Sequence, residues 1–141
     1  MNSVFNPHYR QDCRILLTGA LGFIGNTVLV DLKSRGLQVC AIDKYSMERK
    51  EVVTLDMVNT EALSLLISEF SPDILIHLGT NSAGNYEKNF IDSFQEDSIV
   101  LVNILKCVKT MPELRVVFMS SNYVYSGISE RTIVDEETQN I

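Results

Sequence analysis

Apolar and polar positions follow one another along this chain in blocks of two kinds. Short continuous apolar runs alternate with longer segments in which apolar residues recur every three or four positions. The short runs are typical of buried parallel strands, and the longer spacing is typical of helices. We therefore expect strands over residues 13–17, 37–43, 51–56, 73–79 and 115–121, helices over 23–35, 60–70 and 89–110, and a polar loop over 80–85. The segment 89–110 suits one long helix or two.

Strands that alternate with helices in this way form βαβ units, and right-handed crossovers then build a parallel sheet with helices on both faces. We expect an α/β fold with a Rossmann-type doubly wound sheet and the strand order 3-2-1-4-5. In this architecture a ligand lies outside the carboxyl ends of the strands, beside the first strand. The residues that cap the carboxyl ends of the predicted strands are Gly19, Asp43, Asp56, Gly79 and Ser121.

The segment from Thr18 to Gly25 carries a glycine at every third position. In such a turn Gly19 permits the tight bend, Gly22 lets the backbone approach a phosphate, and Gly25 lets the helix pack closely on the strand. The turn leads into a helix N-terminus, where unpaired N–H groups and the helix dipole attract an anion. The segment predicts a site for the pyrophosphate of a dinucleotide. The alternative is a glycine-rich turn that binds nothing.

Asp43 ends the second predicted strand, eighteen residues after Gly25. An acidic residue at this point accepts hydrogen bonds from the ribose hydroxyls of the adenosine. Its charge repels the 2′-phosphate of NADP, so NAD is favoured, although Lys44, Arg49 and Lys50 nearby oppose this preference. The alternative is a solvated aspartate in a strand-end loop.

Composition and charge narrow the class of protein. The chain has 141 residues, of which 45% are hydrophobic, enough for one packed domain. We expect an N-terminal arm over 1–12 and an NAD-binding domain over 13–141. Twelve basic against eighteen acidic side chains argue against nucleic acid as a partner. The polar start of the chain does not resemble a signal peptide, and no apolar run has transmembrane length, so we expect no membrane partner and a cytoplasmic location.

The cysteines and histidines do not indicate a metal site. Cys13, Cys40 and Cys107 form no CxxC pair and have no histidine at the spacing of metal ligands. We expect reduced core thiols and no bound metal. His77 lies inside an apolar run, which favours a core histidine with one ring nitrogen hydrogen-bonded over a catalytic or metal-binding one.

Together these motifs resemble the extended short-chain dehydrogenase/reductase family, which includes NAD-dependent sugar-nucleotide epimerases, dehydratases and reductases. The resemblance covers residues 14–138. Its motifs are Thr18-Gly-Ala-Leu-Gly-Phe-Ile-Gly25, Asp43, Leu55-Asp56-Met57, His77-Leu78-Gly79, Asn103 and Ser120-Ser-Asn-Tyr-Val-Tyr-Ser-Gly127. The short connection before the third strand, together with residues 121–127, resembles the dTDP-4-dehydrorhamnose reductase branch. The resemblance implies hydride transfer between nicotinamide and a sugar carbon of a nucleotide-sugar substrate.

The family pattern implies roles for the cofactor-binding residues. Phe23 and Ile24 would offer backbone N–H groups to the pyrophosphate. Asp43, with Lys44 beside it, would hold the adenosine ribose. Asp56 and Met57 would bracket the adenine. The positions that would line the channel toward the nicotinamide are Leu78, Gly79 and Thr80.

Ser121 matches the active-site Ser or Thr of the family, which hydrogen-bonds the substrate oxygen that is oxidised or reduced. A hydroxyl can donate to a developing alkoxide and so stabilise it. The alternative is an ordinary strand-end serine. Tyr123 and Tyr125 are expected to pack beside the site, and neither corresponds to the catalytic tyrosine of the family.

The chain also departs from the family pattern. Asn81-Ser82 stands where the family usually has a lysine, Asp97 stands where asparagine is usual, and Gly79-Thr80 replaces Ala-Ala or Ala-Gly. The family uses a Tyr-x-x-x-Lys pair, in which the lysine and the nicotinamide ribose lower the tyrosine pKa for proton transfer. No tyrosine here has a lysine four residues later, and Tyr45 with Arg49 comes nearest.

We therefore expect this chain to be the N-terminal part of a longer enzyme, to end before the last strands and the substrate lobe, and to be inactive alone. Apolar surface should then be uncovered on the fifth strand and the long helix. The family resemblance implies a homodimer through the helix over 89–110. The alternatives are an NAD(P)-binding module without catalysis, acting as a redox sensor or structural subunit, and a scaffold for a flavin or another nucleotide.

Overall fold

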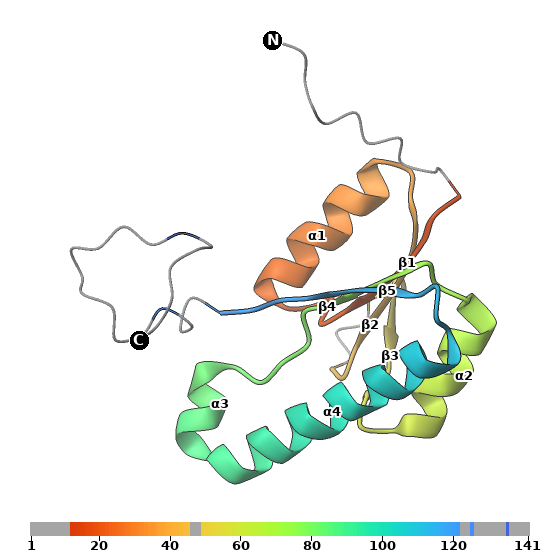
Figure 1. Cartoon of the computed structure of the whole chain (residues 1–141). Helices are drawn as coiled ribbons and strands as arrows, with labels where there is room; N and C mark the ends of the chain where they lie inside the picture. The colour runs from red at the N-terminus through yellow and green to blue at the C-terminus, as the bar shows by residue number, and fades with distance from the viewer. Residues whose placement is uncertain (1–11, 46–48, 122–124, 126–134, 136–141) are drawn as a thin grey trace.

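The computed structural model describes residues 12–45, 49–121, 125 and 135. The predicted arm before Asp12 lies outside this part of the chain. So do residues 122–124 and 126–127 of the Ser120–Gly127 motif, Tyr123 among them, and residues 128–134 and 136–138 of the family resemblance. A five-stranded sheet forms the middle layer, with helices on both of its faces (Figure 1). In chain order the elements are β1 (Arg14–Thr18), α1 (Phe23–Ser34), β2 (Gln38–Asp43), β3 (Val52–Thr54), α2 (Thr60–Phe70), β4 (Ile74–His77), α3 (Ala83–Lys88), α4 (Phe90–Thr110) and β5 (Arg115–Phe118).

The strand order is β3-β2-β1-β4-β5, and every pair of neighbours is parallel, which confirms the predicted Rossmann-type topology. β1 is the central strand, where Leu16 lies opposite Cys40 of β2 and Leu75 of β4. The chain continues from β1 to β2 on one side and reaches β4 on the other. This reversal of strand order opens a crevice at the carboxyl end of β1, where ligands bind in folds of this kind.

α1 covers one face of the sheet, and its packing depends on small residues. Leu29 is buried against Leu17, Ala20 and Ala41. The helix ends at Ser34 with Arg35 as its C-cap, and Gly36 follows with a φ of +74°, which is favourable for glycine. The N–H of Gly36 donates to the carbonyl of Lys33, and that of Leu37 to the carbonyl of Leu32, which is the Schellman arrangement.

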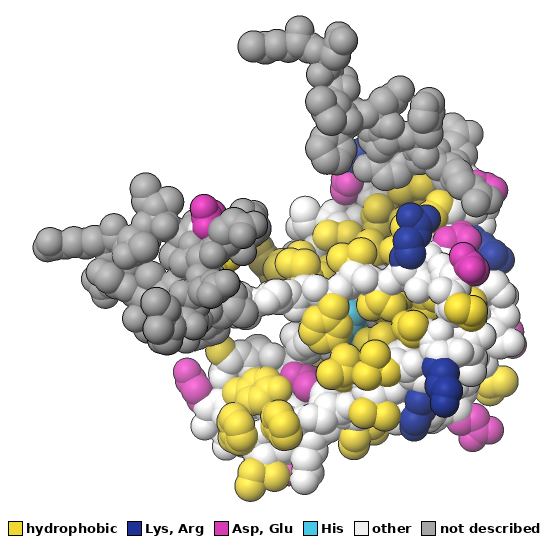
Figure 2. Space-filling view, in the orientation of Figure 1, with side chains coloured by type: hydrophobic (Ala, Val, Ile, Leu, Met, Phe, Trp, Pro, Cys, Tyr) yellow, Lys and Arg dark blue, Asp and Glu magenta, His cyan; other side chains and the backbone are white. Residues whose placement is uncertain are grey.

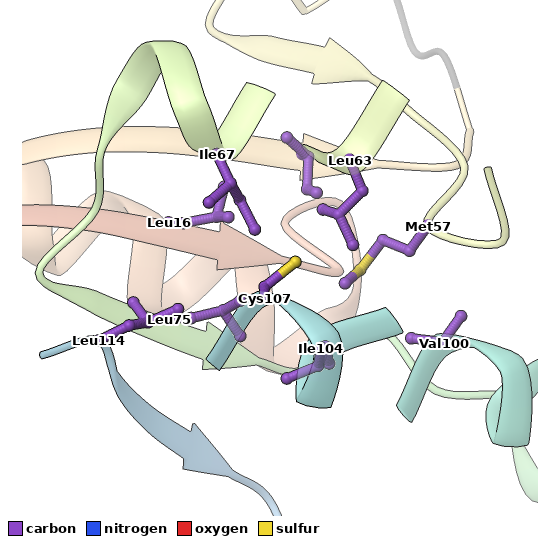
Figure 3. Packing of buried hydrophobic residues seen from close by; sticks show 10 residues of the cluster. Leu16, Met57, Leu63, Ile67, Leu75, Val100, Ile104, Cys107 and Leu114 are labelled. Carbon is purple, nitrogen blue, oxygen red and sulfur yellow. The ribbon is translucent and has the colours of Figure 1, made fainter. Parts of the chain in front are cut away.

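α2 and α4 cover the opposite face and enclose the larger core (Figure 1). Apolar side chains of the sheet, α2 and α4 point toward one another in this layer (Figure 3). The buried members are Leu16, Ile42, Met57, Leu63, Ile67, Leu75, Val100, Ile104, Cys107 and Leu114. Burial of this apolar surface is what holds α2 and α4 to the sheet.

Asn103 is a polar residue inside this core, with a relative exposure of 1%. Its amide nitrogen donates to the carbonyls of Met57, at 2.9 Å, and Val58, at 3.3 Å. Its amide oxygen accepts from the hydroxyl of Thr60 at 2.9 Å. The side chain therefore fastens the loop between β3 and α2 to α4, and this loop carries Met57.

Several predicted boundaries were wrong. β3 ends at Thr54, so Asp56 lies beyond the strand. The predicted loop over 80–85 is wrong in its second half, because Ser82 caps the short helix α3 and accepts from the N–H of Asn85. α3 has no buried residue, so it has no hydrophobic periodicity to reveal it in the sequence. α4 is a single helix, separate from α3.

Apolar side chains are exposed on the outer side of α4 and on β5, as expected from the sequence. Figure 2 shows hydrophobic side chains gathered over this face of the molecule. The exposed members are Phe90, Ile91, Phe94, Ile99, Leu101, Val102, Leu105, Val117 and Phe118. No helix in the described part of the chain is long and apolar enough to cross a membrane.

His77 is a buried residue at the end of β4, next to β1. Its Nδ1 lies 2.8 Å from the hydroxyl oxygen of Thr18, and the same oxygen accepts the N–H of Leu78 at 3.3 Å. This contact satisfies one ring nitrogen of His77, and which of the two atoms donates depends on the tautomer of the imidazole. The ring also contacts Phe118, with the centroids 5.0 Å apart. This confirms the expected core histidine.

Replacing Asn103 by leucine should destabilise the fold by about 2–4 kcal/mol, because the carbonyls of Met57 and Val58 and the hydroxyl of Thr60 lose their partner. Urea unfolding followed by circular dichroism measures this change. Gln95→Leu is the matched control, since Gln95 is exposed on the same helix. We expect it to change the free energy of unfolding by about 0.5 kcal/mol or less. Equal effects of the two substitutions would contradict the structural role of Asn103.

Burial lowers the pKa of His77 below its ordinary value of 6.5, and the charge of Asp97 only partly opposes this. As the pH falls below 6.5, the unfolded chain therefore takes up a proton before the folded one does. The contribution of His77 to stability is complete above that pH and is lost progressively below it. Nuclear magnetic resonance titration should place the midpoint of the His77 ring below 6.5, with His8→Asn used to assign the two histidines. A midpoint at or above 6.5 would contradict the lowered pKa of His77.

Candidate functional site

Two adjoining cavities open at the carboxyl ends of the strands. The Asp43 cavity, of about 450 Å³, lies between the ends of β1 and β2 and the first half of α4. The Ser121 cavity, of about 1050 Å³, lies between the start of α1, α3 and the segment after β5. Gly19, Gly22 and Leu78 line both of them. The two cavities therefore meet at the glycine turn.

Every site residue predicted from the sequence lines one or both of these cavities. The Asp43 cavity is lined by Gly19, Gly22, Asp43, Lys44, Asp56, Met57, Leu78, Gly79 and Thr80. The Ser121 cavity is lined by Gly19, Gly22, Phe23, Ile24, Gly25, Leu78, Thr80 and Ser121. The fold thus brings together residues that are more than 100 positions apart in the chain.

The glycine turn is built by close backbone contacts. Gly19 has a φ of +67°, and a Cβ there would lie 2.6 Å from the backbone nitrogen of Gly79. A Cβ on Gly25 would lie 1.9 Å from the carbonyl oxygen of Gly19, so α1 packs directly on the turn. Gly22 has more room, since its Cβ would meet only that same oxygen, at 3.2 Å. The missing side chain at Gly22 keeps the backbone accessible from both cavities.

The N-terminus of α1 faces the Ser121 cavity without a side-chain cap. Gly22 is the N-cap residue and provides no side-chain cap, and the first turn contains no acidic residue. The first N–H groups of a helix have no partner within the helix, and the helix dipole is positive there. Phe23 and Ile24 supply the first two of these groups. The arrangement suits an anion.

Asp43 is a buried carboxylate that contacts two backbone N–H groups. Its Oδ2 accepts from Leu21 and its Oδ1 from Tyr45, each at 3.0 Å. The side chain therefore fastens the glycine turn to the end of β2, a structural role that the sequence did not reveal. Each carboxylate oxygen has a second lone pair, so Asp43 can still accept a hydrogen bond from a hydroxyl in the cavity.

The Asp43 cavity has a strongly acidic lining. The acidic members are Asp43, Asp56, Glu96 and Asp97, and Lys44 is the basic member. The ammonium of Lys44 lies 2.5 Å from Oε1 of Glu96. Burial lowers the pKa of Lys44, but the hydrogen bond and charge of Glu96 outweigh it and raise that pKa above its ordinary value. The hydrogen bond from Lys44 lowers the pKa of Glu96. The lysine is therefore neutralised by its partner.

Asp97 holds the loop between β4 and α3 against α4. Its Oδ1 accepts two hydrogen bonds from Asn81, one from the backbone N–H at 3.1 Å and one from the side-chain amide nitrogen at 3.0 Å. Its Oδ2 accepts from the hydroxyl of Tyr86 at 2.8 Å. Burial and the charge of Asp97 raise the pKa of Tyr86, which keeps the phenol protonated. The departures from the family pattern at positions 81 and 97 thus contact each other.

Ser121 follows β5 and lines its cavity together with Met119 and Ser120. Tyr86 and Phe90 form an aromatic wall of the same cavity, with ring centroids 5.8 Å apart in an edge-to-face arrangement. A polar hydroxyl and an aromatic wall are the features that commonly position a small organic ligand.

Sequence reasoning missed several residues that line the site. Tyr86 and Glu96 carried no motif, and Asn81 and Asp97 were noted only as departures from a pattern. Glu96 is separated from Lys44 by 52 positions, so no local pattern could connect them. The described residues include no group of three or more His, Cys, Asp or Glu placed to hold a metal ion.

Comparison with known proteins places this geometry in a wider context. Residues 15–140 match the model of the NAD dependent epimerase/dehydratase family. UDP-glucuronate 4-epimerase 1 of Arabidopsis thaliana is 28% identical over 92% of the chain and 34% of that relative. Methionine adenosyltransferase 2 subunit beta of Xenopus tropicalis is 27% identical over 82% of the chain and 34% of that relative. The chain thus spans about a third of the length of these curated relatives.

A solved structure shares the fold. The UDP-glucose 4-epimerase of Thermus thermophilus, in complex with NAD, superposes with a TM-score of 0.78 at 24% identity. The match covers 87% of this chain and 42% of that one. The family model extends over almost the whole sequence and includes the glycine turn, both cavities and Ser121. The chain belongs to the NAD dependent epimerase/dehydratase family.

Proposed function

We propose that this chain forms the cofactor-binding part of an NAD-dependent enzyme of the extended short-chain dehydrogenase/reductase type, which acts on a nucleotide sugar as an epimerase, dehydratase or reductase. The observation that carries the proposal is the junction of the Asp43 and Ser121 cavities at an uncapped helix N-terminus. An extended dinucleotide has an anionic centre between two ribose-linked rings, and it matches this arrangement of two cavities around one anion site.

We propose for the cofactor-binding residues the same roles that the family resemblance implies. The N–H groups of Phe23 and Ile24 would hold the pyrophosphate, because that helix end has no internal cap. The carboxylate of Asp43 would accept from the adenosine ribose with its remaining lone pairs. The residues proposed for the adenine are Asp56 and Met57, and those for the nicotinamide channel are Leu78, Gly79 and Thr80.

The charge of the Asp43 cavity favours NAD over NADP. Asp43, Asp56, Glu96 and Asp97 line it, and its one lysine is paired with Glu96. A 2′-phosphate would bring further negative charge into this lining, whereas the ribose hydroxyl of NAD can donate to a carboxylate. We infer that NAD is the cofactor for this reason.

Ser121 is the residue that we assign to the substrate. Bound NAD would supply a hydride acceptor or donor at its nicotinamide ring. The hydroxyl of Ser121 would donate a hydrogen bond to the sugar oxygen whose carbon exchanges the hydride, and this bond strengthens as negative charge develops there. The aromatic wall of Tyr86 and Phe90 would exclude water from that side of the cavity.

We propose residues 13–141 as one NAD-binding domain of a cytoplasmic protein. A second function is a dinucleotide-binding module without catalysis. It is favoured by the similarity to a relative that is named as a subunit. The coding sequence after Ile141 distinguishes the two, because a Tyr-x-x-x-Lys pair within a few tens of residues would support the enzyme.

The apolar side of α4 suggests a homodimer. Ile91, Phe94, Leu101 and Leu105 are exposed at spacings of three, seven and four residues. This spacing aligns apolar side chains along one helix for packing against another helix. A second copy of the chain can present the same four apolar side chains across a two-fold axis. We propose that the outer side of α4 forms this contact.

Isothermal titration calorimetry of the full chain should detect NAD binding. Gly22→Ala should weaken it about tenfold or more, since a methyl group would stand between the backbone and the pyrophosphate. Gly84→Ala is the matched control, because a Cβ there meets nothing closer than 3.9 Å. We expect it to leave the affinity within about twofold. No heat with NAD, or an unchanged affinity in Gly22→Ala, would overturn the proposed cofactor site.

Sedimentation velocity should show the full chain as a dimer, and Leu105→Glu should shift it to the monomer by placing a charge in the contact. Leu65→Glu is the control, because Leu65, on α2, has an exposed fraction of 59%, close to the 57% of Leu105. It should leave the mass unchanged. A monomeric mass of the unmodified chain would contradict the dimer.

A further inference from the structure

Three basic residues, Lys44, Arg49 and Lys50, lie between Asp43 and β3 in the chain. Two of them, Lys44 and Arg49, are each held by a glutamate. The ammonium of Lys44 lies 2.5 Å from Glu96, and the guanidinium of Arg49 lies 2.5 Å from Glu51. Of the two, Lys44 is the one that lines the Asp43 cavity. Its partner Glu96 and the preceding residue, Asp43, line the same cavity. Whether Lys44 is paired with Glu96 therefore affects how strongly this cavity attracts or repels an anionic group.

Glu96 is fixed from two sides. Its Oε1 accepts from Lys44, and its Oε2 accepts from the side-chain amide of Asn81 at 3.1 Å. The exposed fractions of the two charged side chains are 33% for Lys44 and 30% for Glu96. A partly buried pair of this kind is screened less by salt than a fully exposed pair. The ion pair also joins the end of β2 to α4 across the cavity.

We propose that Glu96 is a specificity residue that favours NAD over NADP by holding Lys44 away from the position of a 2′-phosphate. The inference rests on the proposed function, which places the adenosine ribose at Asp43. Lys44 directly follows Asp43 in the chain, so it is the cation closest in sequence to that ribose. Paired with Glu96, it is already neutralised.

The charges explain the direction of the effect. A 2′-phosphate carries up to about two negative charges, and a lysine beside it would be its natural partner. To use Lys44, NADP must break the ion pair and leave Glu96 as an unpaired carboxylate near the phosphate. NAD has no 2′-phosphate, so the ion pair affects its binding less than it affects the binding of NADP. Glu96 thus disfavours NADP relative to NAD.

The test compares the affinities of NAD and NADP for the full chain by calorimetry. In Glu96→Gln the freed Lys44 should improve the affinity for NADP about fivefold to tenfold more than it changes the affinity for NAD. This gain in NADP affinity should be smaller at higher salt, because it is electrostatic. Glu69→Gln, on the exposed side of α2, removes the same charge and should change neither affinity.

A double substitution distinguishes a lysine-mediated effect from simple repulsion by Glu96. If Glu96 acts by holding Lys44, the gain of Glu96→Gln for NADP should disappear in the Lys44→Met background. An undiminished gain in that background would overturn the inference, and so would an unchanged NADP affinity in the single variant. In both cases NAD binding by the unmodified chain would leave the proposed function standing. If the unmodified chain binds neither nucleotide, the proposed function and this inference both fail.

Discussion

The contact among Gly19, Gly25 and Gly79 is the constraint on which the rest of this site depends. At Gly25 there is no room for a single methyl group, because it would lie 1.9 Å from the carbonyl oxygen of Gly19. α1 and the end of β4 can therefore approach the turn after β1 as closely as backbone allows. This approach brings the helix N-terminus to the crevice and places Leu21 where its N–H reaches Asp43. A side chain at Gly19 or at Gly25 would separate the elements that form the two cavities.

α4 is the second organising element, because one helix positions several loops through polar side chains. Asn103 holds the loop that carries Met57, Asp97 holds the loop after β4, and Glu96 contacts Lys44 at the end of β2. Each of these side chains lies on the side of the helix that is turned toward the sheet or the cavities. The opposite side is apolar and exposed. One helix therefore links the geometry of the proposed cofactor site to the surface proposed for assembly.

The sequence predicted the layers and the strand order because these depend on short-range patterns. Apolar runs and periodic segments identified all five strands, α1, α2 and α4, and the glycine spacing located the turn after β1. It could not predict α3, since a six-residue helix without a buried side chain has no periodic signal. Nor could it predict that Asp43 binds two backbone N–H groups or that Lys44 pairs with Glu96. Such contacts depend on where the chain returns in space, and residue type alone does not encode that.

The central place of β1 also affects the order in which the protein can fold. β1 pairs with β2 after a short crossover, but its other edge pairs with β4, and Ile15 lies opposite Ile74, which comes 59 positions later. During synthesis the growing chain must therefore keep one edge of its most buried strand unpaired until the ribosome has added His77. Throughout that interval Leu16 and Leu17 are exposed on a half-formed sheet, a state that favours binding by chaperones or association between nascent chains.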